Sequence, residues 1–259
     1  TTMAGVNAVN EGDVYTILGT TCCNGIVVDL NKVDLYGGTT YVCHPKKGLG
    51  IDLAATMAGT PNLDWMLDEI AGTHDFGEIE RMIKDIPAGS EGVIYHPYIT
   101  PSGERSPFYN PNARAGFLGL STLATRAHMI KAVYEGIAYS IKDCLYGKDV
   151  SGRIYAAGGG SKSLLWAQII ADVTGCEVVL SEGTEFGAKG AAMLAGVCAG
   201  IYSDINEAAG QLCKVKCTFK PNLENTKIYD ELFKVFRASR IANMEIWNMR
   251  QAALDKIEK

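Results

Sequence analysis

The stretch best suited to binding a ligand is a run of three glycines, Gly158, Gly159 and Gly160, between a predicted strand at 153–157 and a predicted helix at 161–174. Backbone without Cβ atoms can approach a ligand closely, and it tolerates positive φ. The start of a helix offers unpaired N–H groups and a partial positive charge, which suit a phosphate. The segment therefore predicts either a nucleotide cradle or a tight strand-to-helix turn without a ligand, and alone it does not decide between them.

Two further turns carry glycine beside hydroxyl side chains. Gly19, Thr20 and Thr21 follow a predicted strand and can offer backbone N–H groups and hydroxyls to a phosphate. Gly59 and Thr60 interrupt a helical pattern, and a helix that restarts there would direct its N-terminus at an anion. Both turns also have conformational explanations, as a hairpin tip and as a helix junction.

The glycine run is also close to a dinucleotide-binding fingerprint. It has Ser163 where that fingerprint has a third Gly or Ala, but Glu182 ends the next predicted strand, near where a ribose-binding acid would lie. An NAD-binding dehydrogenase domain is therefore an alternative on local evidence.

Composition narrows the choice of partners. The chain has 259 residues, 47% of them hydrophobic and 20% charged, which is ordinary for a globular protein with a substantial core. A net charge of −5 without a basic stripe argues against nucleic acid. The longest apolar stretch, 191–202, is too short to span a bilayer, and no signal segment leads the chain, so we expect no membrane partner.

The cysteines and histidines do not form a metal-binding pattern. None of their spacings matches a zinc site or a disulfide scaffold, so we expect no metal site and a reduced, cytoplasmic setting. The eight cysteines are at positions 22, 23, 43, 144, 176, 198, 213 and 217, and the four histidines are at 44, 74, 96 and 128.

Hydrophobic patterning predicts one α/β domain. We expect a hairpin from strands at 14–18 and 25–30, then a third strand at 41–44 and a helical stretch over 51–71. A short helix is expected in a surface excursion at 72–90. The remaining expected strands are at 92–95, 153–157, 177–180 and 214–219, and the remaining helices at 121–146, 161–174, 185–200 and after Pro221.

The most specific pattern lies at 115–135. Residues 115–120 read AGFLGL, and after a gap of seven, residues 128–135 read HMIKAVYE. This string resembles the second signature of the FGGY carbohydrate kinases, the family of xylulose, ribulose, gluconate and glycerol kinases. The segments HPYITPSGERSP at 96–107, PNAR at 111–114, GGGSKS at 158–163 and GAKGAA at 187–192 are similar to xylulokinase-like members. The resemblance covers nearly the whole chain.

The resemblance implies a ribonuclease-H-like domain of the actin/hexokinase/Hsp70 type, a mixed sheet flanked by helices. Residues 1–259 would be the C-terminal, nucleotide-binding domain, and an N-terminal sugar-binding domain would be absent from the chain. Gly19 and Thr20 would contact the β- and γ-phosphates, and Gly59 would lie near the transferred phosphoryl group. The adenosine and α-phosphate loop would be 158–160, with Ser163 at the adenine. Thr21 begins a Thr-Cys-Cys run where Ser-Gly is commoner after Gly-Thr.

The resemblance implies ATP with Mg²⁺ as cofactor and a pentulose of the xylulose type, or a related polyol, as substrate. It is compatible with a homodimer. Counted back from Gly19 in the family pattern, the catalytic Asp would fall a few residues before Thr1, and Asp13 beside Gly12 is better explained as a turn residue. We therefore expect the chain to bind ATP or ADP without catalysing transfer. A non-catalytic nucleotide-sensing module is a second alternative.

Overall fold

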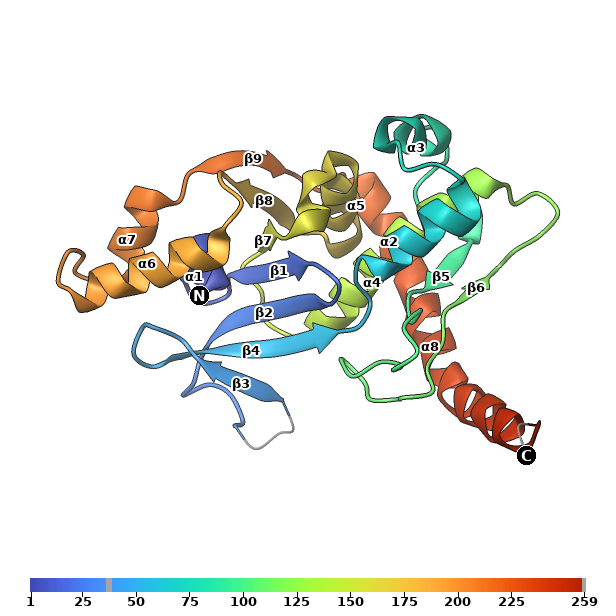
Figure 1. Cartoon of the computed structure of the whole chain (residues 1–259), viewed down its shortest axis with the longest axis horizontal. Helices are drawn as coiled ribbons and strands as arrows, with labels where there is room; N and C mark the ends of the chain where they lie inside the picture. The colour runs from blue at the N-terminus through green and yellow to red at the C-terminus, as the bar shows by residue number, and fades with distance from the viewer. Residues whose placement is uncertain (36–38, 258–259) are drawn as a thin grey trace.

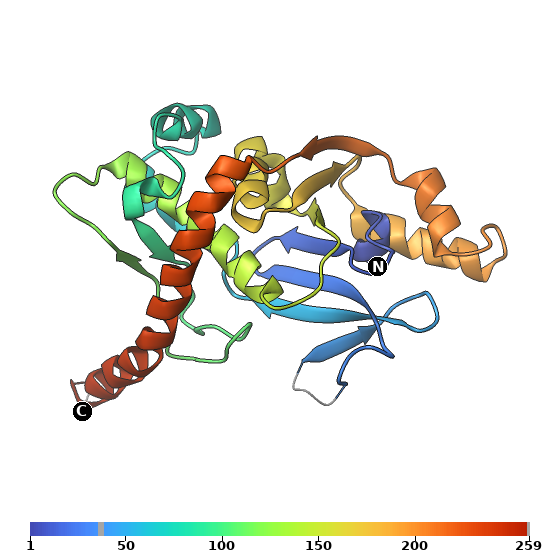
Figure 2. The same ribbon diagram turned by 180° about the vertical axis from the view of Figure 1, so that it is seen from behind.

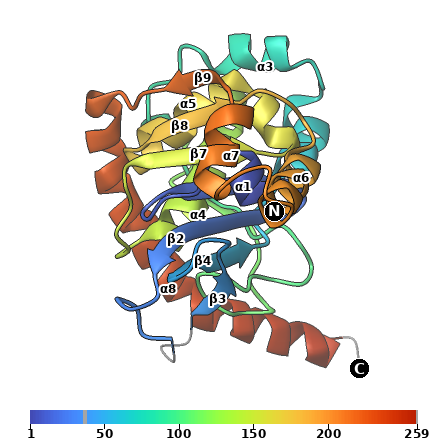
Figure 3. The same cartoon turned by 90° about the vertical axis from the view of Figure 1, so that its left-hand side faces the viewer.

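Seven strands form one mixed sheet within residues 1–35 and 39–257, the part of the chain that this computed structural model describes (Figure 1). They lie in the order β3, β4, β2, β1, β7, β8 and β9, and Figure 3 shows them stacked from β9 to β3. Their bounds are β1 Val14–Leu18, β2 Cys22–Asp29, β3 Thr40–Cys43, β4 Leu49–Thr56, β7 Arg153–Ala157, β8 Glu177–Ser181 and β9 Val215–Phe219.

The strand directions bring four strand ends to one edge of the sheet. Strand β1 pairs in parallel with β7, and β7 in parallel with β8. Strand β2 is antiparallel to both β1 and β4, so β4 runs in the same direction as β1. The turns that follow β1, β4, β7 and β8 therefore emerge at the same edge.

Helices cover both faces of the sheet. Successive side chains of a strand point to opposite faces, so Val14 and Leu18 of β1 enter one hydrophobic cluster and Tyr15 enters a second. The first cluster includes α4, α5 and α8, and the second includes α1, α6 and α7. The helix bounds are α1 Thr2–Gly5, α2 Pro61–Met66, α3 Phe76–Ile83, α4 Arg126–Leu145, α5 Leu164–Thr174, α6 Phe186–Cys198, α7 Ile205–Leu212 and α8 Leu223–Ile257.

The long helix α8 crosses the back of the molecule and continues past its body (Figure 2). Beside it lies a second sheet formed by β5 Ile94–His96 and β6 Gly116–Leu118, which are antiparallel. The segment between these strands packs its Tyr98 and Phe108 against Trp247 of α8. This segment, residues 97–115, is thus fastened to the terminal helix.

The helical prediction for 51–71 was wrong at its start. Residues 51–56 belong to β4, which is hydrogen-bonded to β2 on one side and to β3 on the other. Two hydrogen-bonded neighbours outweigh the helix propensity of Leu53, Ala54 and Ala55. Helix α2 begins only at Pro61 and continues as a π-helix over Leu67–Ala71.

Other expected elements were confirmed, with shifts at their ends. The hairpin β1–β2 is present, and so are the predicted strands that became β3, β5, β7, β8 and β9. The helices α3, α4, α5, α6 and α8 are also present, whereas α1, β6 and α7 were missed. Helix α5 starts at Leu164, because Gly159–Lys162 form a 3₁₀ turn. No helix among residues 1–35 and 39–257 is both long and apolar enough to cross a membrane.

Candidate nucleotide site

Two of the predicted glycine turns meet directly at the edge where β1 and β4 end. A Cβ atom on Gly59 would lie 2.4 Å from the carbonyl oxygens of Gly19 and Thr20. The next residue fastens this contact, because the Thr60 N–H donates to the Gly19 carbonyl at 2.8 Å. Gly59 is therefore glycine because the backbone of the β1–β2 hairpin fills the space of a side chain.

The glycine run after β7 packs against the same strand end. Gly158 has φ +90°, which favours glycine, and a Cβ there would lie 2.7 Å from the Leu18 carbonyl oxygen. A Cβ on Gly160 would lie 2.4 Å from the Trp166 ring. In contrast, a Cβ on Gly159 would meet nothing within 4 Å, so this residue faces open space.

Beside the open face of the glycine run lies a pocket of about 500 Å³. One wall is the run with the start of α5, and the other is formed by α2, the π-helix and α3. The lining residues are Thr60, Leu63, Asp64, Leu67, Phe76, Glu80, Gly159, Gly160, Lys162, Ser163, Leu164 and Trp166. The walls are largely apolar, and two carboxylates and one ammonium group supply the charge. A flat aromatic group with polar edges fits such a lining.

Ser163 has a structural contact in this wall. Its hydroxyl accepts a hydrogen bond from the Trp166 N–H at 3.2 Å and so caps the N-terminus of α5. The hydroxyl hydrogen is still available as a donor. Ser163 can therefore hold the helix start and face the pocket at once.

The hairpin tip offers hydroxyls but no reactive thiol. Thr20 is exposed and Thr21 is half-buried, whereas Cys22 is fully buried beside the Thr16 hydroxyl. Burial raises the pKa of the Cys22 thiol to about 12, so it stays protonated at neutral pH. The Thr-Cys-Cys run thus places one cysteine in the core as a small packed side chain.

Asp13 closes a turn, as expected. Its carboxylate accepts hydrogen bonds from the N–H groups of Val9 at 3.1 Å and Asn10 at 2.9 Å. It precedes β1, at the sheet edge opposite the glycine turns. Within the described residues, no group of three or more His, Cys, Asp or Glu side chains is placed to hold a metal ion.

The structure brings most of the predicted site residues together in two groups. Gly159, Gly160 and Ser163 line the pocket, and Gly19, Thr20 and Gly59 contact one another next to it, linked through Thr60. Gly158 and Thr21 do not line the pocket; Gly158 packs on the Leu18 carbonyl, and Thr21 lies in the tip of the β1–β2 hairpin.

Sequence reasoning missed the opposite wall of the pocket. Phe76 and Glu80 belong to the 72–90 excursion, which carries no motif, and Asp64 lies in a segment that read only as helix. A charged residue every few positions on a surface helix gives no signal that distinguishes a pocket wall from a solvated face.

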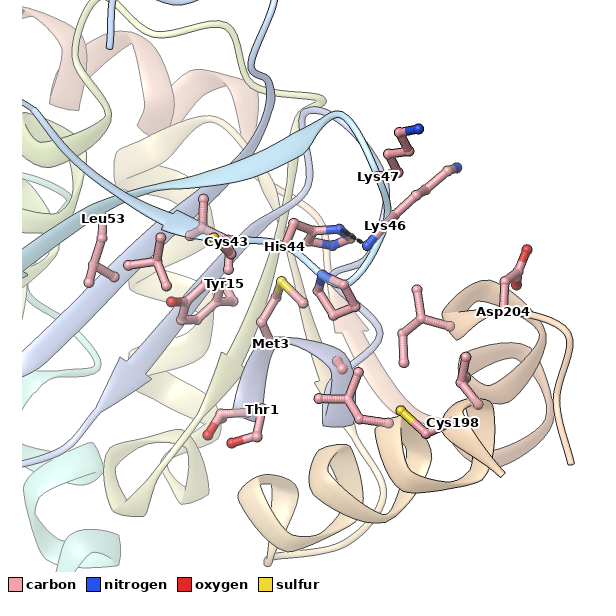
Figure 4. A pocket seen from close by; sticks show the side chains of 18 of the residues that line it. Thr1, Met3, Tyr15, Cys43, His44, Lys46, Lys47, Leu53, Cys198 and Asp204 are labelled. Atoms are coloured by element: carbon pink, nitrogen blue, oxygen red, sulfur yellow. Dashed lines mark hydrogen bonds between the residues drawn. The ribbon is translucent and has the colours of Figure 1, made fainter. Parts of the chain in front are cut away.

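A larger hollow, of about 810 Å³, lies on the other face of the sheet (Figure 4). It lies between β3–β4 and the helices α1 and α6, and residues such as Met3, Tyr15 and Leu53 make it mostly apolar. None of the predicted site residues lines it. Size alone therefore does not select a ligand site, and we take the pocket beside the glycine turns as the candidate.

Solved structures similar to this one include sugar kinases. Ligand-bound xylulose kinase from Lactobacillus acidophilus is 27% identical with a TM-score of 0.84, over 93% of this chain and 49% of that one. Gluconate kinase from the same organism is 26% identical with a TM-score of 0.85, over 96% and 51%. The expected actin/hexokinase-like α/β fold is confirmed.

The sequence assigns the family. Residues 14–199 match the model for the FGGY family of carbohydrate kinases, C-terminal domain, and the chain belongs to this family of phosphotransferases. It is 28% identical to xylulose kinase of Bacillus subtilis over 90% of this chain, and 30% identical to erythritol kinase of Brucella abortus over 85%. The chain spans about half the length of these relatives, 47% and 44% respectively.

Proposed function

We propose that the chain is the nucleotide-binding half of an ATP-dependent sugar kinase. The observation that carries this proposal is the meeting of three glycine turns at one sheet edge, beside a pocket of about 500 Å³. The pocket would hold the adenosine, with Gly159, Gly160 and Ser163 on one side. Gly19, Thr20, Thr21 and Gly59 would face the phosphates, and Gly158 would shape the loop between these two regions.

The donor chemistry fits ATP. Turn backbone and threonine hydroxyls donate hydrogen bonds, which suits phosphate oxygens. Without a carboxylate cluster among the described residues, Mg²⁺ would be held mainly through the phosphates and by groups outside this chain. The bound metal and nucleotide would supply the transferable phosphoryl group and its charge neutralisation; the residues named here would bind and orient the nucleotide.

The sugar site would come from a second domain of the same polypeptide, and the catalytic base from a segment outside the residues of this chain. The curated relatives are about twice as long as this chain, and phosphoryl transfer to a hydroxyl needs a positioned carboxylate as well as the nucleotide. A xylulose-type pentulose is the proposed substrate of the whole protein, with a related polyol next. The chain alone should not phosphorylate D-xylulose with MgATP.

Calorimetric titration of the chain with MgADP and with NAD tests the proposal. MgADP should bind and NAD should not. Gly59→Ala should weaken MgADP binding, because its Cβ would push the hairpin aside. Gly210→Ala on α7 is the matched control, because a Cβ atom there would meet no other atom within 4 Å. Binding of NAD but not MgADP would instead favour a dehydrogenase domain. The mixed sheet, antiparallel through β2, already argues against that alternative.

A further inference from the structure

Glu104 is a buried carboxyl group outside the predicted site, in the segment between β5 and β6. Its side chain is 1% exposed and lies against the end of β4. Oε2 accepts a hydrogen bond from the Thr56 hydroxyl at 2.5 Å, and Oε1 accepts one from the Met57 N–H at 2.8 Å. Oε1 also accepts from the Arg105 N–H at 2.7 Å, within its own loop. Glu104 therefore ties this loop to the last residues of β4.

The hydrogen bonds continue from Glu104 to the phosphate side of the candidate site. The Thr56 hydroxyl accepts from the Ala58 N–H at 3.0 Å, and Ala58 is completely buried. The next residue is Gly59, which packs on the carbonyls of the hairpin tip. The turn 57–60 is thus held by Glu104 at one end and by the hairpin at the other.

The loop that carries Glu104 is itself rigidly held. Glu104 and Asn110 exchange both backbone hydrogen bonds at 2.9 Å, and the Asn110 side chain donates to the Met244 carbonyl on α8 at 3.2 Å. Burying a carboxyl group costs free energy unless hydrogen bonds compensate for the lost water. Here hydroxyl and amide donors compensate, and two of them, the Thr56 hydroxyl and the Met57 N–H, lie just before Gly59 in the chain.

We propose that Glu104 is a positioning residue that fixes the Gly59 turn against the phosphate-binding hairpin. The proposal rests on the proposed nucleotide function of that hairpin. It predicts that the position of the Glu104 oxygens, rather than the negative charge, is what matters. Glutamine keeps an oxygen for the N–H groups, and its NH₂ can donate to the Thr56 hydroxyl, whose hydrogen can turn to Ser140 Oγ 3.3 Å away.

The test compares MgATP with adenosine, because only MgATP reaches the hairpin. Affinities for both are measured by calorimetry on the chain and on Glu104→Asp, Glu104→Gln and Thr56→Val. Aspartate keeps the charge but is one methylene shorter, and valine removes the linking hydroxyl at nearly the same volume. Glu104→Asp and Thr56→Val should bind MgATP about tenfold more weakly, with adenosine affinity unchanged within about twofold. Glu104→Gln should stay within about threefold of the wild type for both ligands.

Each outcome is decisive. Equal weakening of both ligands in Thr56→Val, or unchanged MgATP affinity in a folded Glu104→Asp, would overturn the positioning role. If Glu104→Asp does not fold, the MgATP and adenosine affinities of Thr56→Val and Glu104→Gln decide whether Glu104 has the positioning role. A wild-type chain that binds neither ligand would overturn the proposed function, and the positioning role with it. A wild type that binds MgATP beside unaffected variants would overturn the positioning role alone.

Discussion

Glu135, the last residue of the signature, should make the stability of this domain depend on pH. It lies in the middle of α4 and is 1% exposed. Its carboxyl oxygens accept hydrogen bonds from the Gly89 N–H at 3.0 Å, the Ser90 hydroxyl at 2.7 Å and the Tyr229 hydroxyl at 2.8 Å. These contacts hold a turn in which all four residues, 89–92, have positive φ, between 48° and 88°. A left-handed turn of this kind costs free energy and needs such support.

The magnitude follows from the pKa of Glu135. Burial raises it from 4.5 to about 7, although the hydrogen bonds from Ser90 and Tyr229 and the charge of Lys131 lower it. Since the folded state holds the proton more tightly than the unfolded state, the stabilising contribution is complete below pH 4.5 and is lost as the pH rises towards 7. Between pH 5 and 8 the free energy of unfolding should fall by about 2–3 kcal/mol through this group alone.

The variant Glu135→Gln isolates this contribution. Glutamine has the shape of the protonated acid and does not titrate, so the variant should gain about 2–3 kcal/mol relative to the wild type between pH 5 and pH 8. Urea denaturation at a series of pH values measures the difference in free energy of unfolding between the variant and the wild type. Other titrating groups are the same in both proteins, so their contributions cancel in this difference. Glu245→Gln removes the same charge from an exposed position on α8 and serves as the control. A difference between Glu135→Gln and wild type that does not change from pH 5 to 8, or that changes with the opposite sign, would refute the reasoning.

Two further predictions concern a buried ion pair and a close backbone contact. Asp143→Ala should cost about 3–5 kcal/mol in chemical denaturation, because it leaves the buried Arg240 guanidinium of α8 without the carboxylate now 2.9 Å away. Asp230→Ala, which removes the exposed partner of Lys142, should cost less than about 1 kcal/mol, and equal losses would contradict the assignment. Gly160→Ala should destabilise by about 1–3 kcal/mol through collision with Trp166, and it should weaken MgADP binding in calorimetry. Gly210→Ala should be neutral or stabilising by up to about 1 kcal/mol, so destabilisation there would show that any added methyl is harmful.

How far the sequence predicts this structure depends on whether a feature is local. The glycine run between β7 and α5 was predicted because a strand, three glycines and an apolar helix are adjacent in the chain. Strand β4 was not, because the alanines at 54 and 55 favour a helix and only pairing with β2 and β3 makes the segment extended. The pocket wall from α2 and α3 was also missed, since it becomes a wall only when the chain folds back onto the glycine run.

The signature segment, residues 115–135, does not line the candidate site. None of the residues 115–135, all of which the structure describes, borders the pocket of about 500 Å³. Glu135 instead supports the left-handed turn, and a Cβ on the adjacent Gly136 would lie 2.3 Å from the Tyr95 carbonyl oxygen, so α4 and β5 can pack closely only with glycine there. Glu104, in the run that precedes the signature, likewise acts on a turn. Glu135 and Gly136 thus fix backbone that packs on α4 and do not line the pocket, so a substitution at either residue should change stability before it changes ligand contacts.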